Sequence, residues 1–161
     1  MWDPESISAV CAWTIQELDY IKEYSNATIP KHLLDDHGLH MACFLGDLEL
    51  VKIFVEQGAD VNLMHGMYLT PLHQAAMTGH HKIIQYLLEN GANINLMKGD
   101  ISPIVLAWQK NQIETIKFLI RNRADITSKT SWLEEAKEKG HDFEDYRDIF
   151  LMKSSYIKPA R

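Results

Sequence analysis

Apolar residues recur along the chain in short stripes that follow one another at a nearly constant interval. One stripe occupies residues 83–88 at positions i, i+1, i+4 and i+5, a spacing that places them on one face of a helix. Matching stripes lie 33 residues earlier, within 50–55, and 32 residues later, within 115–120. The interval predicts a repeat protein, because units of this length bury their apolar faces against their neighbours.

The unit that begins near residue 70 shows how each repeat is built. Thr70 is a good helix N-cap, and Pro71 suits the first position of a helix, where its missing N–H costs nothing. We expect a short helix that stops at Gly79, which reaches the left-handed conformation without strain. A second helix should follow from His81, and Gly91 should end it. Small residues in the first helix and large ones in the second favour two antiparallel helices that pack closely.

The same unit resembles the ankyrin repeat. The resemblance is carried by Thr70-Pro71-Leu72-His73, Ala75-Ala76, Gly79-His80, Leu87-Leu88 and Gly91-Ala92. It implies an all-α fold, an ankyrin-repeat solenoid of stacked antiparallel helix pairs with projecting β-hairpin loops.

The spacing predicts a single domain over residues 1–153, built of successive units. We expect an N-terminal cap at about 5–36, repeats at 37–69, 70–101 and 102–130, a C-terminal cap at 131–153 and a flexible tail at 154–161. The caps are degenerate, since the last unit places acidic residues where the apolar stripe should be. His37-Gly38 replaces Thr-Pro, so the first repeat lacks the usual helix cap unless Asp36 serves. Asn111 stands for the helix-ending Gly, and Trp108 stands where earlier units have Ala or Cys.

Composition narrows the class of protein. The 46% hydrophobic and 24% charged residues are typical of a globular domain, and no stretch is long and apolar enough for a membrane span. A net charge of −6 disfavours nucleic acid, and the start of the chain has no signal-peptide pattern. We therefore expect a cytoplasmic monomer that binds neither nucleic acid nor membrane. Translocation into a host cell as a bacterial effector is an alternative.

Neither the histidines nor the cysteines form a catalytic or metal-binding pattern, so we expect no enzyme activity, no metal and no cofactor. The resemblance implies that His40 and His73 form structural hydrogen bonds between units, and His80 and His141 also occupy repeated positions. The other histidines are unassigned: His32, His37, His65 and His81. Cys11 and Cys43 are too few for a disulfide framework, and Cys43 occupies a packing position, which favours a buried, inert thiol.

The resemblance implies that a partner contacts the hairpin tips and the exposed end of each first helix. Many residues there are apolar, and exposed apolar patches commonly mark interfaces. The candidate contacts are Phe44, Leu45, Met64, Met67, Tyr68, Met77, Met97, Trp108, Gln109 and Lys110, with Asp100 and Glu138 at the rim. We expect a module that binds a protein or peptide on its concave face. The alternative is a regulatory inhibitor, antitoxin-like or effector protein that blocks or recruits an enzyme.

Overall fold

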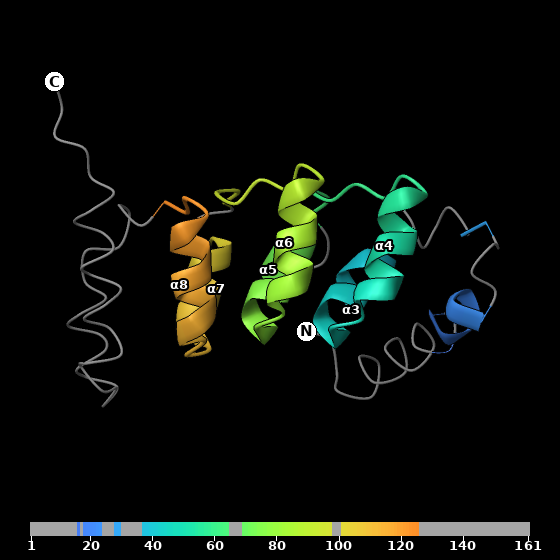
Figure 1. The fold of residues 1–161 in the computed structure, drawn as a ribbon, viewed down its shortest axis with the longest axis horizontal. Helices are drawn as coiled ribbons and strands as arrows, with labels where there is room; N and C mark the ends of the chain where they lie inside the picture. Colours follow the sequence, from blue (N-terminus) through green and yellow to red (C-terminus); the bar gives the residue numbers. More distant parts are fainter. Residues whose placement is uncertain are drawn as a thin grey trace, which may run out of the picture.

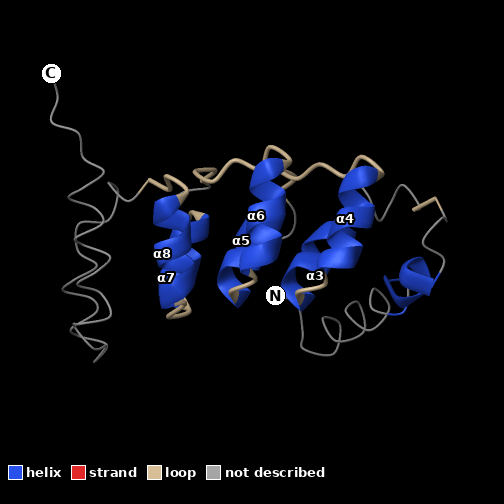
Figure 2. Ribbon diagram, in the orientation of Figure 1, coloured by secondary structure: helices blue, strands red, loops and turns tan. Residues whose placement is uncertain are grey.

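The computed structural model describes residues 16, 18–23, 28–29, 37–64, 69–97 and 101–125 of the chain. Within these residues it contains three consecutive helix pairs, which lie side by side in chain order (Figure 1). The pairs are α3 (Gly38–Leu45) with α4 (Leu48–Glu56), α5 (Pro71–Thr78) with α6 (His81–Glu89), and α7 (Pro103–Gln109) with α8 (Ile113–Arg121). The expected all-α fold is confirmed, and the described segments between the helices are loops and turns (Figure 2), apart from single β-bridge residues at Leu69 and Ile101.

Left-handed residues end the first helices as the sequence predicts. Gly46 and Gly79, both at φ 82°, cap the C-termini of α3 and α5. In the third unit Asn111 takes φ 56° in place of glycine, which its short polar side chain tolerates. Gly91 ends the second helix of the middle unit as predicted, because α6 runs to Glu89 and Gly91 takes the left-handed conformation at φ 88° in the turn that follows.

Helix starts differ between units in the way the N-cap residues dictate. Thr70 forms a capping box with His73: the Thr70 hydroxyl accepts from the His73 N–H, and the His73 ring accepts from the Thr70 N–H. Asp47 caps α4 by accepting from the Leu50 N–H at 3.2 Å. His37 makes no side-chain cap hydrogen bond at the start of α3, so the departure from Thr-Pro removes that contact. Asp36 lies outside the described residues.

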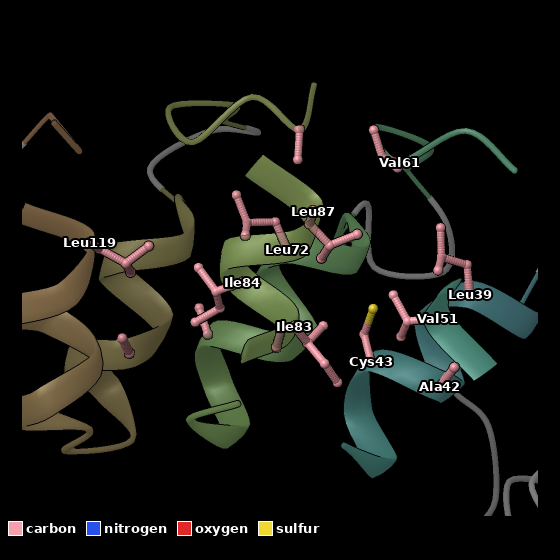
Figure 3. Packing of buried hydrophobic residues seen from close by; sticks show 14 of the residues in the cluster. Leu39, Ala42, Cys43, Val51, Val61, Leu72, Ile83, Ile84, Leu87 and Leu119 are labelled. Carbon is pink, nitrogen blue, oxygen red and sulfur yellow. The ribbon is translucent and has the colours of Figure 1, made fainter. Parts of the chain in front are cut away.

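The core lies between the helix pairs. The first helices α3, α5 and α7 pack directly against one another, and the small residues Ala42, Ala75 and Ala107 are fully buried where they meet. Larger side chains from the second helices, including Phe54 and Leu87, fill the remaining space. Figure 3 shows buried side chains of all three pairs lying between the ribbons. The stripes predicted from the sequence therefore face the core.

The loop that leads from the first unit to the second is also tied to α3 by hydrogen bonds. The His40 Nε2 lies 2.9 Å from the Leu63 carbonyl and 3.0 Å from that of Leu69. Because carbonyls only accept, this nitrogen carries the proton and donates to both. The structural role that the resemblance implied for His40 is confirmed.

The predicted caps fall largely outside the described residues. Residues 18–23 are helical, with Leu18 and Ile21 buried in the common core. Lys22 forms an ion pair with Asp47, and the Ile29 N–H donates to Gln57 Oε1 at 2.7 Å. These contacts attach the N-terminal segment to the first repeat. The predicted C-terminal cap at 131–153 lies outside the description, as does the tail.

Candidate functional site

The end of α3 presents the most exposed apolar side chains of the first helices. Phe44 is 45% exposed and Leu45 is 47% exposed. Their backbone is fixed from behind, since Gly46 turns the chain and a His80 ring nitrogen lies 3.3 Å from the Phe44 carbonyl. The two side chains thus project from a rigid turn toward solvent.

The next two units place different side chains at equivalent positions. Met77 and Thr78 at the end of α5 are half-buried, and the Thr78 hydroxyl donates to the Gln74 carbonyl at 2.9 Å. Gln109 and Lys110 at the end of α7 are exposed. We call these three pairs together the first-helix face: Phe44, Leu45, Met77, Thr78, Gln109 and Lys110.

The loops between units contribute a second set of apolar residues. Met97 is 43% exposed, and its counterpart one unit earlier, Met64, is half-buried. Met67 and Tyr68 were predicted to contact a partner and lie outside the described residues. The loops therefore add at least one exposed methionine beyond the first-helix face.

The prediction that Trp108 contacts a partner is corrected by the structure. Its side chain is 4% exposed and belongs to the buried hydrophobic cluster. Trp108 occupies the position in its repeat that Cys43 and Ala76 occupy in theirs, and both of those residues are fully buried. The side chain at this position points into the core because of its place on the helix, whatever its volume. Trp108 is therefore a core residue.

Charge is distributed unequally between the two helices of each pair. Helices α3, α5 and α7 contain no Asp, Glu, Lys or Arg. The second helices carry the charged residues, namely Glu49, Lys52, Glu56, Lys82, Glu89, Glu114, Lys117 and Arg121. Lys110 is therefore the one charged residue of the first-helix face, whose other five residues are uncharged.

The described residues offer little for catalysis or metal binding. No three His, Cys, Asp or Glu side chains among them are arranged to hold a metal ion. Burial raises the pKa of the Cys43 thiol well above its usual value, so the side chain stays protonated and a poor nucleophile. The expectation of a buried Cys43 is confirmed. Within the same part of the chain, no helix has the length and apolar character needed to cross a membrane.

The histidines have structural surroundings. Desolvation by burial lowers the pKa of His73 to about 4, so it is neutral at pH 7. His81, which the sequence left unassigned, stacks on Phe118 with ring centroids 5.3 Å apart, and its Nε2 lies 2.9 Å from the Thr115 hydroxyl. Both partners lie 34 and 37 residues later in sequence, so only the stacking of units reveals the contact. His32 and His65 are outside the described residues.

The sequence analysis gives Asn62 and Asn95 no role, whereas the structure gives them a specific one. The Asn62 amide donates to the Gly91 carbonyl at 3.0 Å and accepts from the Asn93 N–H at 2.8 Å. Asn95 accepts from the Asp125 N–H at 2.7 Å. The signal was the recurrence of Asn after 33 residues. These bonds hold successive loops, including the one that carries Met97, in a fixed relation.

Comparison with known families agrees with this architecture. A family model of ankyrin repeats in three copies matches residues 39–130, which is more than half of the chain. The chain therefore belongs to the ankyrin-repeat family. Ankyrin repeats are generally protein–protein interaction modules, and the family is typically non-catalytic. No curated protein matches the chain in sequence.

Proposed function

We propose that this chain is a protein-interaction module that binds a protein or peptide partner on the first-helix face and the adjoining loops. The observation that carries the proposal is the exposure of Phe44 and Leu45 on helices that contain no charged residue. Contiguous apolar patches on a protein surface commonly mark a site that a partner covers, and Phe44 and Leu45 are adjacent exposed members of such a patch.

The energetics of such a surface favour a few central contacts. Burial of a fully exposed Phe or Leu side chain contributes roughly 1.5–3 kcal/mol, and aromatic and methionine residues are enriched at the centres of interfaces. Phe44, Leu45 and Met77 supply this kind of centre, while Gln109 and Lys110 are suited to the rim. An interface of standard size buries about 800 Å² on each partner.

The fixed geometry of the face also supports binding. Phe44 is backed by His80, and the loops are tied by Asn62 and Asn95. A surface that is already ordered loses little conformational entropy when a partner binds. The repeat scaffold therefore supports recognition without a conformational change.

The experiment is affinity capture with the full chain as bait, followed by mass spectrometry. The test variant is Phe44→Ala with Met77→Ala, and the control is Lys82→Ala with Gln85→Ala, two exposed positions on α6. Circular dichroism establishes that both variants are folded. We expect proteins captured by the wild type and by the control to be lost from the test variant. Equal capture by all three proteins would contradict the proposal.

A further inference from the structure

The exposed pair at the end of each first helix changes in polarity along the stack. In order, the pairs are Phe44 and Leu45, Met77 and Thr78, and Gln109 and Lys110. The first pair is apolar, the second is mixed and the third is polar with one positive charge. The first-helix face thus has a direction, from apolar at α3 to cationic at α7.

The distance along this direction follows from helix packing. Helix α5 contacts both α3 and α7, and Figure 1 shows the three pairs following one another in chain order. Packed helices lie about 8–10 Å apart, so the first and third pairs are separated by about 16–20 Å. An extended chain advances about 3.3 Å per residue and covers that distance in about five or six residues.

The charge at the far end is available for a partner. Among the described residues, no carboxylate forms an ion pair with Lys110, and the side chain is exposed. The helix that precedes it and the two other first helices carry no acidic residue. A carboxylate on a bound segment therefore has Lys110 as its local ionic partner on this face.

We propose, building on the function inferred above, that the first-helix face recognises an extended partner segment with one apolar end and one acidic end. Apolar side chains of the segment cover Phe44 and Leu45. An acidic side chain about five or six residues away along the segment pairs with Lys110. The apolar end supplies most of the affinity, while the charged end fixes which way the segment lies across the units.

The test uses a phage-displayed library of random peptides of about 16 residues, long enough to reveal either an extended spacing or the roughly twelve-residue spacing that a helix would need. The baits are the wild type, Lys110→Glu, Phe44→Ala, and Lys82→Glu as the control on the opposite helix row. Selected peptides are then synthesised and their dissociation constants measured by fluorescence anisotropy.

We expect wild type and Lys82→Glu to enrich peptides with aliphatic or aromatic residues and an acid about five or six positions away. With Lys110→Glu the acid should be replaced by Lys or Arg, and individual acidic peptides should weaken by about 2–5-fold, the size of an exposed ion pair. Phe44→Ala should lose the apolar selection.

Three results would overturn the inference: no enrichment, no acidic preference, or an unchanged preference with Lys110→Glu. A spacing of about twelve residues would overturn the extended form. Peptides that depend on Phe44 but ignore Lys110 would leave the proposed function standing while removing this inference, so the two fail separately.

Discussion

The imidazole of His80 lies directly over Gly46, the residue that ends α3. A Cβ added to Gly46 would lie 2.4 Å from the ring Cε1 atom of His80. The next unit repeats the arrangement, because a Cβ added to Gly79 would lie 2.8 Å from the side-chain oxygen of Gln112. His80 and Gln112 are the N-caps of α6 and α8. The starts of α6 and α8 therefore close over the turn of the preceding unit.

Gly46→Ala should destabilise the fold more than Gly58→Ala. Both glycines have positive φ, 82° and 92°, so both substitutions carry the left-handed penalty of about 1–2 kcal/mol. Only Gly46 also meets a neighbour, since nothing lies within 4 Å of a Cβ at Gly58. We expect an extra loss of about 1 kcal/mol for Gly46→Ala in urea unfolding. Adding His80→Ala should recover that extra loss, and equal losses for the two alanine variants would contradict the contact.

Arg123→Gly should stabilise the protein. Arg123 takes φ 68° where the two earlier units have Gly58 and Gly91, and a long side chain is strained there. The substitution removes the left-handed penalty but adds the entropy cost of glycine. We therefore expect the free energy of unfolding to rise by about 0.5–1 kcal/mol. Asn111→Gly is the comparison, because Asn tolerates the same region and the gain should be smaller. A lower unfolding midpoint for Arg123→Gly would show that its side chain contributes more than its backbone costs.

Asn62→Ala should weaken the coupling between the first and second repeats. The substitution removes two hydrogen bonds to the next loop, whereas Asn95→Ala removes one. At about 1 kcal/mol per bond, reduced by the exposure of the site, we expect losses of about 1–2 kcal/mol and about 0.5–1 kcal/mol. Hydrogen exchange should become faster at the Asn93 amide. If exchange there is unchanged, the bond does not protect that amide in solution.

Stability should fall as the pH drops from about 6.5 to about 4, in part through His73. Desolvation by burial lowers its pKa to about 4, from 6.5 in the unfolded chain. Between pH 6.5 and pH 4, His73 is therefore protonated in the unfolded state and neutral in the folded state. Because only the unfolded state binds the proton, the folded state loses stability as the pH falls, until the pH reaches the folded pKa. Protonation of Nδ1 would also break its bond from the Thr70 N–H.

The expected His73 contribution over that range is about 3 kcal/mol, from roughly 1.4 kcal/mol per pKa unit. His73→Gln does not titrate, so its unfolding free energy should change less between pH 7 and pH 4 even though the variant is less stable at pH 7. Parallel pH curves for the wild type and His73→Gln would contradict the assignment.

The parts of the fold that the sequence predicts are those set by local chemistry. Thr70 caps a helix because its hydroxyl reaches its own first turn, and Gly46 and Gly79 end helices because of their backbone freedom. These effects depend on a few adjacent residues, and the two glycines lie 33 positions apart. Gly91 ends α6 for the same reason, at the left-handed position that follows the helix cap Asn90.

The candidate site was less predictable because exposure depends on neighbours distant in sequence. Phe44 and Leu45 are exposed as expected, but Trp108 is buried, since the stack accepts a large ring at a position that is small in the other units. The His81 contact with Phe118 and the tie between Asn62 and Asn93 join residues of different units. No local pattern contains such contacts, which exist only once the units are stacked.

The most direct test of the central claim is the dissociation constant of a captured partner, measured by isothermal titration calorimetry with the wild type, Phe44→Ala and Lys82→Ala. If the first-helix face is the binding surface, Phe44→Ala should weaken binding by about 10-fold or more, the effect of losing a central contact worth over 1.4 kcal/mol. Lys82→Ala should bind like the wild type. An unchanged constant for a folded Phe44→Ala, or a loss confined to Lys82→Ala, would contradict the account.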